Sequence, residues 1–215
     1  MAMSGPLRLV QYWDTGAPPP EVAALMRTWA IDTAFRYDAF DRDRAIAYLA
    51  ARFPARVVAA FAKCRYPAMQ ADLFRYCALY ADGGIYIDAD TSNGGGLRRM
   101  LDDCGRGCIM NRQGKIANDF MYFAMPSDAL LGAVVERAVA NIEGEVSNNV
   151  WQVTGPGIMT TMHADPGTKP MFDGLRLLPV EVVRKVVLFR WDLEYKKTEE
   201  DWRGALVPGG KSIFN

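Results

Sequence analysis

The feature that most constrains the fold is a pair of glycines between a helix-like segment and a short apolar run that ends in two carboxylates. Residues 71–82 have the pattern of a helix, residues 83–84 are glycines that end it, and residues 85–90 read as a strand. Because successive side chains of a strand point to opposite faces, one face is expected to be apolar core and the other polar. Three side chains should share the polar face: Tyr86, Asp88 and Asp90.

Asp88 and Asp90 lie two residues apart on this predicted face, where their charges repel unless a cation lies between them. Carboxylate oxygens suit a hard ion such as Mg²⁺ or Mn²⁺. A bound diphosphate is the natural further ligand of such an ion. The pattern therefore predicts a Mn²⁺ or Mg²⁺ site with Asp88 and Asp90 as metal ligands.

Helices and short strands alternate along the chain. Apolar spacing predicts further helices over 21–30, 41–51, 55–63 and 128–141. Strands are expected over 7–13 and from Ile109, with 118–124 as strand or loop and 180–189 as an interrupted β-branched run. The alternation predicts an α/β fold, a mixed sheet with helices on both faces, whose ligands bind beyond the carboxyl ends of strands.

Composition limits the class of protein. A chain of 215 residues, 50% hydrophobic, is expected to form one domain over residues 1–215. The chain has 25 Lys and Arg residues and 25 Asp and Glu residues, so its net charge is zero. It also has no basic tract, so no nucleic-acid partner is expected. The apolar runs are too short for a transmembrane segment, the start does not resemble a signal peptide, and four cysteines are too few for a disulfide framework, so we expect a cytoplasmic protein with free thiols.

A set of residues around the two carboxylates has a distinctive order and spacing: Asp72, Arg75, Tyr76, Leu79-Tyr80, Gly83-Gly84-Ile85-Tyr86 and Asp88-Ala89-Asp90. This set resembles the sugar-binding region, with its DXD element, of the family 32 type glycosyltransferases. That group includes fungal mannosyltransferases, bacterial capsule enzymes and, more distantly, the glucosylating clostridial toxins. Three further segments resemble landmarks of the family: Val10-Gln11-Tyr12-Trp13, Asn118-Asp119 and Thr154-Gly155-Pro156. The resemblance implies the GT-A architecture, a single Rossmann-like domain that binds a nucleotide sugar.

The resemblance also implies roles for single residues. Asp72 and Arg75 would hold hydroxyls of the donor sugar, Trp13 would stack on the nucleobase, and Tyr86 would contact the sugar or phosphate through its hydroxyl. Asn118, Asp119 and Thr154 would line the cleft for donor and acceptor. Gln11-Tyr12 stands where the family usually has a His before the Trp.

The same residues also have structural interpretations. Asp72 and Arg75 are spaced for an i,i+3 ion pair on a helix, worth a few tenths of a kcal/mol. Trp13 would serve as a core aromatic, and the segments at Asn118 and Thr154 would be an ordinary loop start and turn. Near the C-terminus, Lys196 or Lys197 is a candidate contact for the diphosphate, and three residues are candidates for a late metal ligand: Asp201, Ser212 and Asn215. A solvated charged tail is the alternative there.

The resulting prediction is a metal-dependent, retaining glycosyltransferase that moves a sugar from a UDP- or GDP-sugar to a hydroxyl of a glycan or lipid-linked saccharide. Asp88 and Asp90 would be its catalytic residues: Asp90 would hold the cation, and Asp88 would share in contacts with the metal or with the ribose of the donor. One alternative is a haloacid dehalogenase-like phosphatase, because residues 85–91 resemble its strand with an Asp-x-Asp-x-Thr motif. The register differs, since position five of that motif is Ser92. The other alternative is a sugar-nucleotide-binding module that has lost catalysis.

Overall fold

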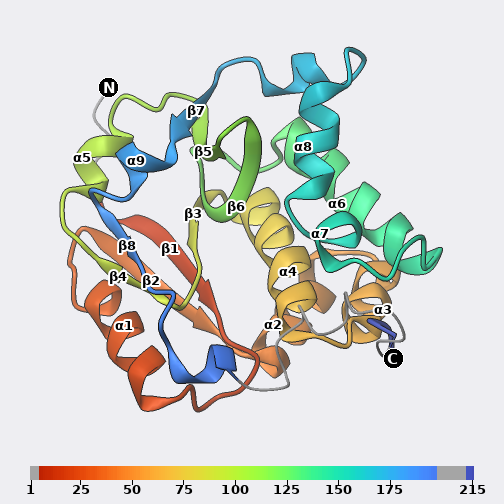
Figure 1. The fold of residues 1–215 in the computed structure, drawn as a ribbon, viewed down its shortest axis with the longest axis horizontal. Coiled ribbons are helices and arrows are strands. Elements are labelled where there is room, and N and C mark those ends of the chain that lie inside the picture. Colours follow the sequence, from red (N-terminus) through yellow and green to blue (C-terminus); the bar gives the residue numbers. More distant parts are fainter. Residues whose placement is uncertain (1–4, 198–211) are drawn as a thin grey trace.

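A six-stranded mixed sheet forms the centre of the computed structural model, which describes residues 5–197 and 212–215 (Figure 1). In spatial order its strands are β2 (Phe35–Phe40), β1 (Leu7–Tyr12), β3 (Gly84–Ile87), β6 (Lys115–Phe123), β5 (Gly107–Arg112) and β7 (Leu175–Pro179). β1 runs parallel to β2 and β3, β6 is antiparallel to β3 and β5, and β7 is parallel to β5. The predicted mixed α/β fold is confirmed.

Helices cover both faces of the sheet, as predicted. One face packs on helices α2 (Arg42–Arg52), α3 (Ala55–Lys63), α4 (Pro67–Asp82), α6 (Ala129–Glu143), α7 (Val150–Val153) and α8 (Gly157–Ala164). The other packs on α1 (Pro20–Ala30), α5 (Leu97–Leu101) and α9 (Val180–Val183). The described residues also form two 3₁₀ helices: η1 (Lys169–Phe172) lies between α8 and β7, and η2 (Glu194–Lys197) comes after β8. Alternation along β3 divides it between these cores, with Tyr86 on the α4 side and Ile85 and Ile87 on the other.

Helix α4 carries polar residues into the interior. Pro67 begins the helix, and Gly83, with a φ of 64°, caps its C-terminus. At Gly84 a Cβ atom would lie 2.7 Å from the carbonyl oxygen of Arg8 on β1, so only glycine lets the chain turn into β3 beside β1. Of the eleven positions of α4 from Met69 to Leu79, all but Ala71 are buried, which makes it the central helix of the fold.

The strand that was predicted to continue to Asp90 ends at Ile87, so that prediction is wrong. Asp88 follows the strand, and Ala89 and Asp90 form a turn. The carbonyl of Asp88 accepts hydrogen bonds from Gln11 Nε2 at 3.1 Å and Thr91 Oγ1 at 2.8 Å, and these contacts replace a strand ladder. Asp88 and Asp90 therefore project from a turn and do not share a strand face.

After this turn the chain enters a second, two-stranded sheet. β4 (Thr91–Asn93) pairs antiparallel with β8 (Val187–Phe189), so the exit of the turn is joined to the C-terminal part of the chain. The predicted β-branched run 180–189 is divided into α9 and β8. Of the segment 118–124, predicted as strand or loop, residues 118–123 belong to strand β6. No helix among the described residues is long and apolar enough to cross a bilayer. All four cysteines are buried free thiols.

Candidate active site

Arg75 on helix α4 is the centre of a buried polar cluster. Its Nη2 atom lies 3.2 Å from Asp72 Oδ1 and 3.1 Å from Asp88 Oδ1, and its Nη1 donates to the carbonyl of Asn118 at 2.7 Å. The Arg75 side chain is only 5% exposed, so its charge is compensated almost entirely by protein groups. The guanidinium also lies 4.5 Å from the centre of the Tyr86 ring. Arg75 thus joins helix α4 to the residue that follows β3.

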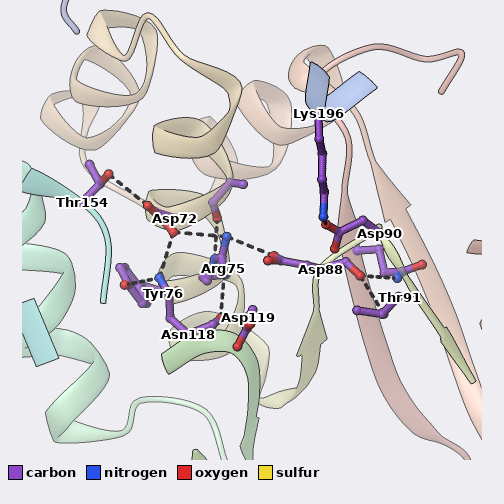
Figure 2. A network of polar contacts seen from close by, with 12 residues as sticks. Asp72, Arg75, Tyr76, Asp88, Asp90, Thr91, Asn118, Asp119, Thr154 and Lys196 are labelled. Carbon is purple, nitrogen blue, oxygen red and sulfur yellow. Dashed lines mark hydrogen bonds and ion pairs between the residues drawn. The ribbon is translucent and has the colours of Figure 1, made fainter. Parts of the chain in front are cut away.

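Asp72 collects the remaining members of this cluster (Figure 2). Asn118 Nδ2 donates to Asp72 Oδ1 at 2.8 Å, and Thr154 Oγ1 donates to Asp72 Oδ2 at 3.2 Å. Asn118 Nδ2 also lies 2.7 Å from the hydroxyl of Tyr76. Burial raises the pKa of Asp72, although Arg75, Asn118 and Thr154 oppose the shift. Residues from α4, β6 and the end of α7, predicted separately from the sequence, therefore meet at one carboxylate.

Asp88 connects this cluster with the turn. Its backbone N–H donates to the carbonyl of Asp119 at 3.0 Å, while its side chain, 32% exposed, pairs with Arg75. Partial burial and the nearby carboxylates, Asp90 foremost, raise the pKa of Asp88 to about 8, although Arg75 opposes this shift. The crowding of negative charge makes the site attractive to a cation.

Asp90 faces the C-terminal segment. Asp90 Oδ2 lies 2.5 Å from Lys196 Nζ and accepts a hydrogen bond from Tyr195 Oη at 3.1 Å. The Asp90 carbonyl accepts from the Arg190 N–H at 3.2 Å. The segment between β8 and the end of η2 is thus fastened over the turn.

Asp119 on β6 has a partner that the sequence did not indicate. Arg112 Nη2, from β5, lies 2.5 Å from Asp119 Oδ2. The register between β5 and β6 shifts at Ile109 and Met110, and this irregularity is what lets two residues that are not cross-strand partners meet. No spacing rule applied to the sequence would have found this pair.

Three buried side-chain atoms have no hydrogen-bond partner among the described residues: Tyr86 Oη, Arg112 Nε and Asp119 Oδ1. Burial and the nearby Asp88 carboxylate raise the pKa of Tyr86, although Arg75 opposes the shift. A buried polar atom without a hydrogen bond lowers the stability of the fold. The three atoms lie around Asp88 and Asp119, so a polar ligand bound there would supply the missing hydrogen bonds.

Trp13 lies at the Asp90 side of the site, directly after β1. Its ring meets the edge of Tyr195 with centroids 5.0 Å apart, and it packs half-buried on the cluster that contains Ala89 and Leu193. Gln11 donates to the Asp88 carbonyl at 3.1 Å and accepts from Tyr37 Oη at 2.9 Å. Trp13 therefore borders the turn rather than the Asp72 cluster.

The other C-terminal candidates lie elsewhere or outside the described residues. The side chain of Lys197 and all of Asp201 fall outside them. Asn215 Nδ2 donates to the carbonyl of Ala62 on α3 at 3.2 Å, and Ser212 Oγ accepts from the Phe214 N–H at 3.1 Å. Lys196 is the predicted tail residue that the structure brings to Asp90.

Residues 20–103 match the family model described as glycosyltransferase sugar-binding region containing DXD motif. Among solved structures the chain resembles one named "PaToxG Glycosyltransferase", with 13% sequence identity and a TM-score of 0.58 over 94% of this chain and 86% of that chain. No curated protein matches the sequence. The matched region contains Asp72, Arg75, Asp88 and Asp90, whereas Asn118 and Thr154 join them only through the fold. These findings support a sugar-transfer role. Residues 20–103 therefore resemble a glycosyltransferase sugar-binding region containing a DXD motif, and the overall fold resembles that of a solved glycosyltransferase, which supports a GT-A type fold.

Proposed function

We propose that this chain transfers a sugar from a UDP- or GDP-sugar to a hydroxyl of a glycan or lipid-linked saccharide, with Mn²⁺ or Mg²⁺ held by Asp88 and Asp90. The observation that most supports this proposal is that the buried guanidinium group of Arg75 contacts both Asp72 and Asp88. A reducing compartment such as the cytoplasm fits the four free thiols.

The carboxylates fit a divalent cation. Asp88 and Asp90 each already hold a positive side chain, Arg75 and Lys196, which shows that their surroundings favour positive charge. Among the described residues no group of three or more His, Cys, Asp or Glu side chains is arranged to hold a metal. Diphosphate and water oxygens would then complete the coordination, as is usual for Mg²⁺. When bound, the cation neutralises the charge that develops on the departing diphosphate.

The chain's own residues position the donor sugar. Asp72 and Arg75 together offer an acceptor and a donor for sugar hydroxyls, and Asn118 and Thr154 fix the Asp72 carboxylate in place. In the transfer, the bond between the anomeric carbon and the diphosphate oxygen breaks with its electron pair leaving on the diphosphate. The acceptor oxygen bonds to the anomeric carbon, and its proton passes to a phosphate oxygen of the departing nucleotide. The resemblance to family 32 type enzymes implies retention of configuration.

Lys196→Met is expected to bind Mn²⁺ roughly tenfold more tightly than the wild type in the absence of nucleotide, because the ammonium group no longer competes for Asp90. Isothermal titration calorimetry of the purified chain measures this directly. Lys169→Met, which removes an exposed ammonium group on η1, is the control and should leave the affinity unchanged. Equal or weaker Mn²⁺ binding by Lys196→Met would show that Lys196 does not occupy the place of the cation.

Trp13→Ala is expected to weaken nucleotide binding by roughly 1–3 kcal/mol, the scale of base stacking on aromatic side chains. Titration with UDP and GDP in the presence of Mn²⁺ gives the affinity, and thermal unfolding of the same samples shows whether the fold persists. A drop in unfolding temperature without a change in nucleotide affinity would assign Trp13 to packing against Tyr195 alone.

The proposed function is tested with a panel of UDP- and GDP-sugars and one phosphate monoester. At a concentration of 100 times its Kd, a true donor raises the free energy of unfolding by about 2.7 kcal/mol, and this stabilisation should require Mn²⁺ or Mg²⁺. Release of sugar together with nucleotide diphosphate supports the transferase. Hydrolysis of the monoester through a phosphoprotein at Asp88 would support the phosphatase instead, and binding without turnover would support the binding module.

A further inference from the structure

An exposed pair of aromatic rings lies beside the turn formed by residues 88–90, which is called the DXD turn below. Phe189 at the end of β8 and Trp191 stack with ring centroids 6.3 Å apart and planes inclined by 21°. Trp191 is 59% exposed, although Phe189 is partly buried. A large flat ring held in place and left open to solvent is typical of a binding surface.

The same two rings line a hollow of about 400 Å³, together with Arg184, Val187 and Leu188. This volume lies at the low end of the roughly 300–1,000 Å³ found for small-molecule sites, so it suits one or two sugar units rather than a folded protein. The lining contains a cation and no carboxylate. A ligand with a neutral or negatively charged ring system would therefore fit it.

Two cations connect this aromatic pair to the carboxylates of the active site. The Arg112 guanidinium lies 5.6 Å from the centre of the Phe189 ring and 5.2 Å from that of Trp191, while its Nη2 holds Asp119. Lys196 Nζ lies 5.2 Å from the Trp191 ring centre and holds Asp90. Two rings that line the hollow thus lie next to the cations that hold Asp90 and Asp119.

Unpaired polar atoms point to a ligand at this junction. Arg112 Nε and Asp119 Oδ1 are buried and have no hydrogen-bond partner among the residues described. One hydroxyl group can accept from the first and donate to the second, and a sugar supplies several hydroxyls around an apolar ring face.

We propose that the Phe189–Trp191 pair and its hollow bind the acceptor, and that the acceptor is a saccharide. A pyranose ring packs on Trp191, and one of its hydroxyls reaches Arg112 and Asp119 next to the DXD turn. This assignment rests on the proposed transferase function. In it the two substrates contact different residues: the donor sugar binds at Asp72 and Arg75, and the acceptor binds at Arg112 and Trp191.

The test uses the full chain loaded with Mn²⁺ and with UDP or GDP, whichever binds. Saturation-transfer NMR with maltose, cellobiose, lactose, diacetylchitobiose and trigalacturonate measures saccharide binding, and sedimentation with vesicles of phosphatidylcholine and phosphatidylglycerol measures membrane binding. At least one saccharide is expected to bind the wild type, with affinity roughly tenfold weaker in Trp191→Ala and partly recovered in Trp191→Phe. Met125→Ala, which truncates another exposed apolar side chain, is the control and should bind as the wild type does.

Turnover separates this inference from the proposed function. Donor hydrolysis and transfer to the bound saccharide are measured in the same samples, and the ratio of transfer to hydrolysis should fall in Trp191→Ala. If no saccharide binds, if Trp191→Ala binds it as well as the wild type, or if Trp191 supports vesicle binding instead, the acceptor assignment is wrong. If the wild type neither binds nucleotide nor hydrolyses any donor, the transferase proposal itself fails.

Discussion

Asp90→Asn should reduce turnover of the nucleotide-sugar donor on the order of 10²–10³-fold, the loss seen when one group that stabilises transition-state charge is removed. The substitution keeps the size of the side chain and removes the charge that a divalent cation needs. Asp90 lies in a turn whose carbonyl is held by the Arg190 N–H, so the backbone has a fixed point that does not depend on the carboxylate. The fold should therefore persist while metal binding fails.

Release of nucleotide diphosphate, with and without chelator, measures this effect. Asp102→Asn is a suitable control, because Asp102 is a half-exposed carboxylate on the surface, 3.9 Å from Arg98. The control should behave as the wild type, with activity that chelator removes and Mn²⁺ restores. Turnover by Asp90→Asn that stays within a few-fold of the control would exclude Asp90 as a metal ligand.

Arg75→Met should lower the free energy of unfolding by roughly 3–5 kcal/mol, because it leaves the buried Asp72 carboxylate without its cation. For a chain of this size that corresponds to a fall of roughly 6–20 °C in unfolding temperature. The same change should also abolish sugar transfer, since Arg75 positions Asp72 and Asp88 together.

Two further variants make this result specific. Arg56→Met removes a surface arginine that pairs with Glu136 at 2.7 Å and Glu143 at 3.0 Å, and it should change stability far less because solvent screens that pair. Asp72→Asn combined with Arg75→Met should recover part of the lost stability, since the unpaired charge is gone. If Arg75→Met and Arg56→Met have the same unfolding temperature, or if the double variant recovers no stability, then Asp72 and Arg75 do not stabilise the fold as a pair.

Local patterns were enough to predict the helix that carries Asp72 and Arg75 and the strand that follows it. The glycines that end the helix and the apolar residues of the strand lie within a few residues of one another. The start of the helix was not predicted, because α4 begins at Pro67, four residues before the predicted start at residue 71. The turn at residues 89–90 was missed, because apolar and polar residues continue to alternate through it. Hydrogen bonds from Gln11, which lies on another strand, and from Thr91 hold the Asp88 carbonyl at this turn.

The site shows the same division between local and tertiary information. The Asp72–Arg75 ion pair follows from i,i+3 spacing, and it coexists with the buried cluster in which the role in sugar binding is proposed. Arg112 was not predicted, because its contact with Asp119 depends on a register shift between two strands. Strand β2 was missed as well, since its alternation of aromatic and charged residues is short and its charged side chains stay partly in solvent.

The pairing of β4 with β8 has a consequence for synthesis of the protein. Thr91 leaves the DXD turn and aligns with Phe189, a residue made much later. Chains emerge from the ribosome starting at the N-terminus, so the helix, glycines and carboxylates are all present long before their partner strand. During that interval Asp90 lacks Tyr195 and Lys196, and the turn lacks the strand that pairs with its exit. A nascent chain should thus complete the proposed donor site only after Lys196 has been synthesised, which delays binding of the proposed nucleotide sugar until strand β8 is in place.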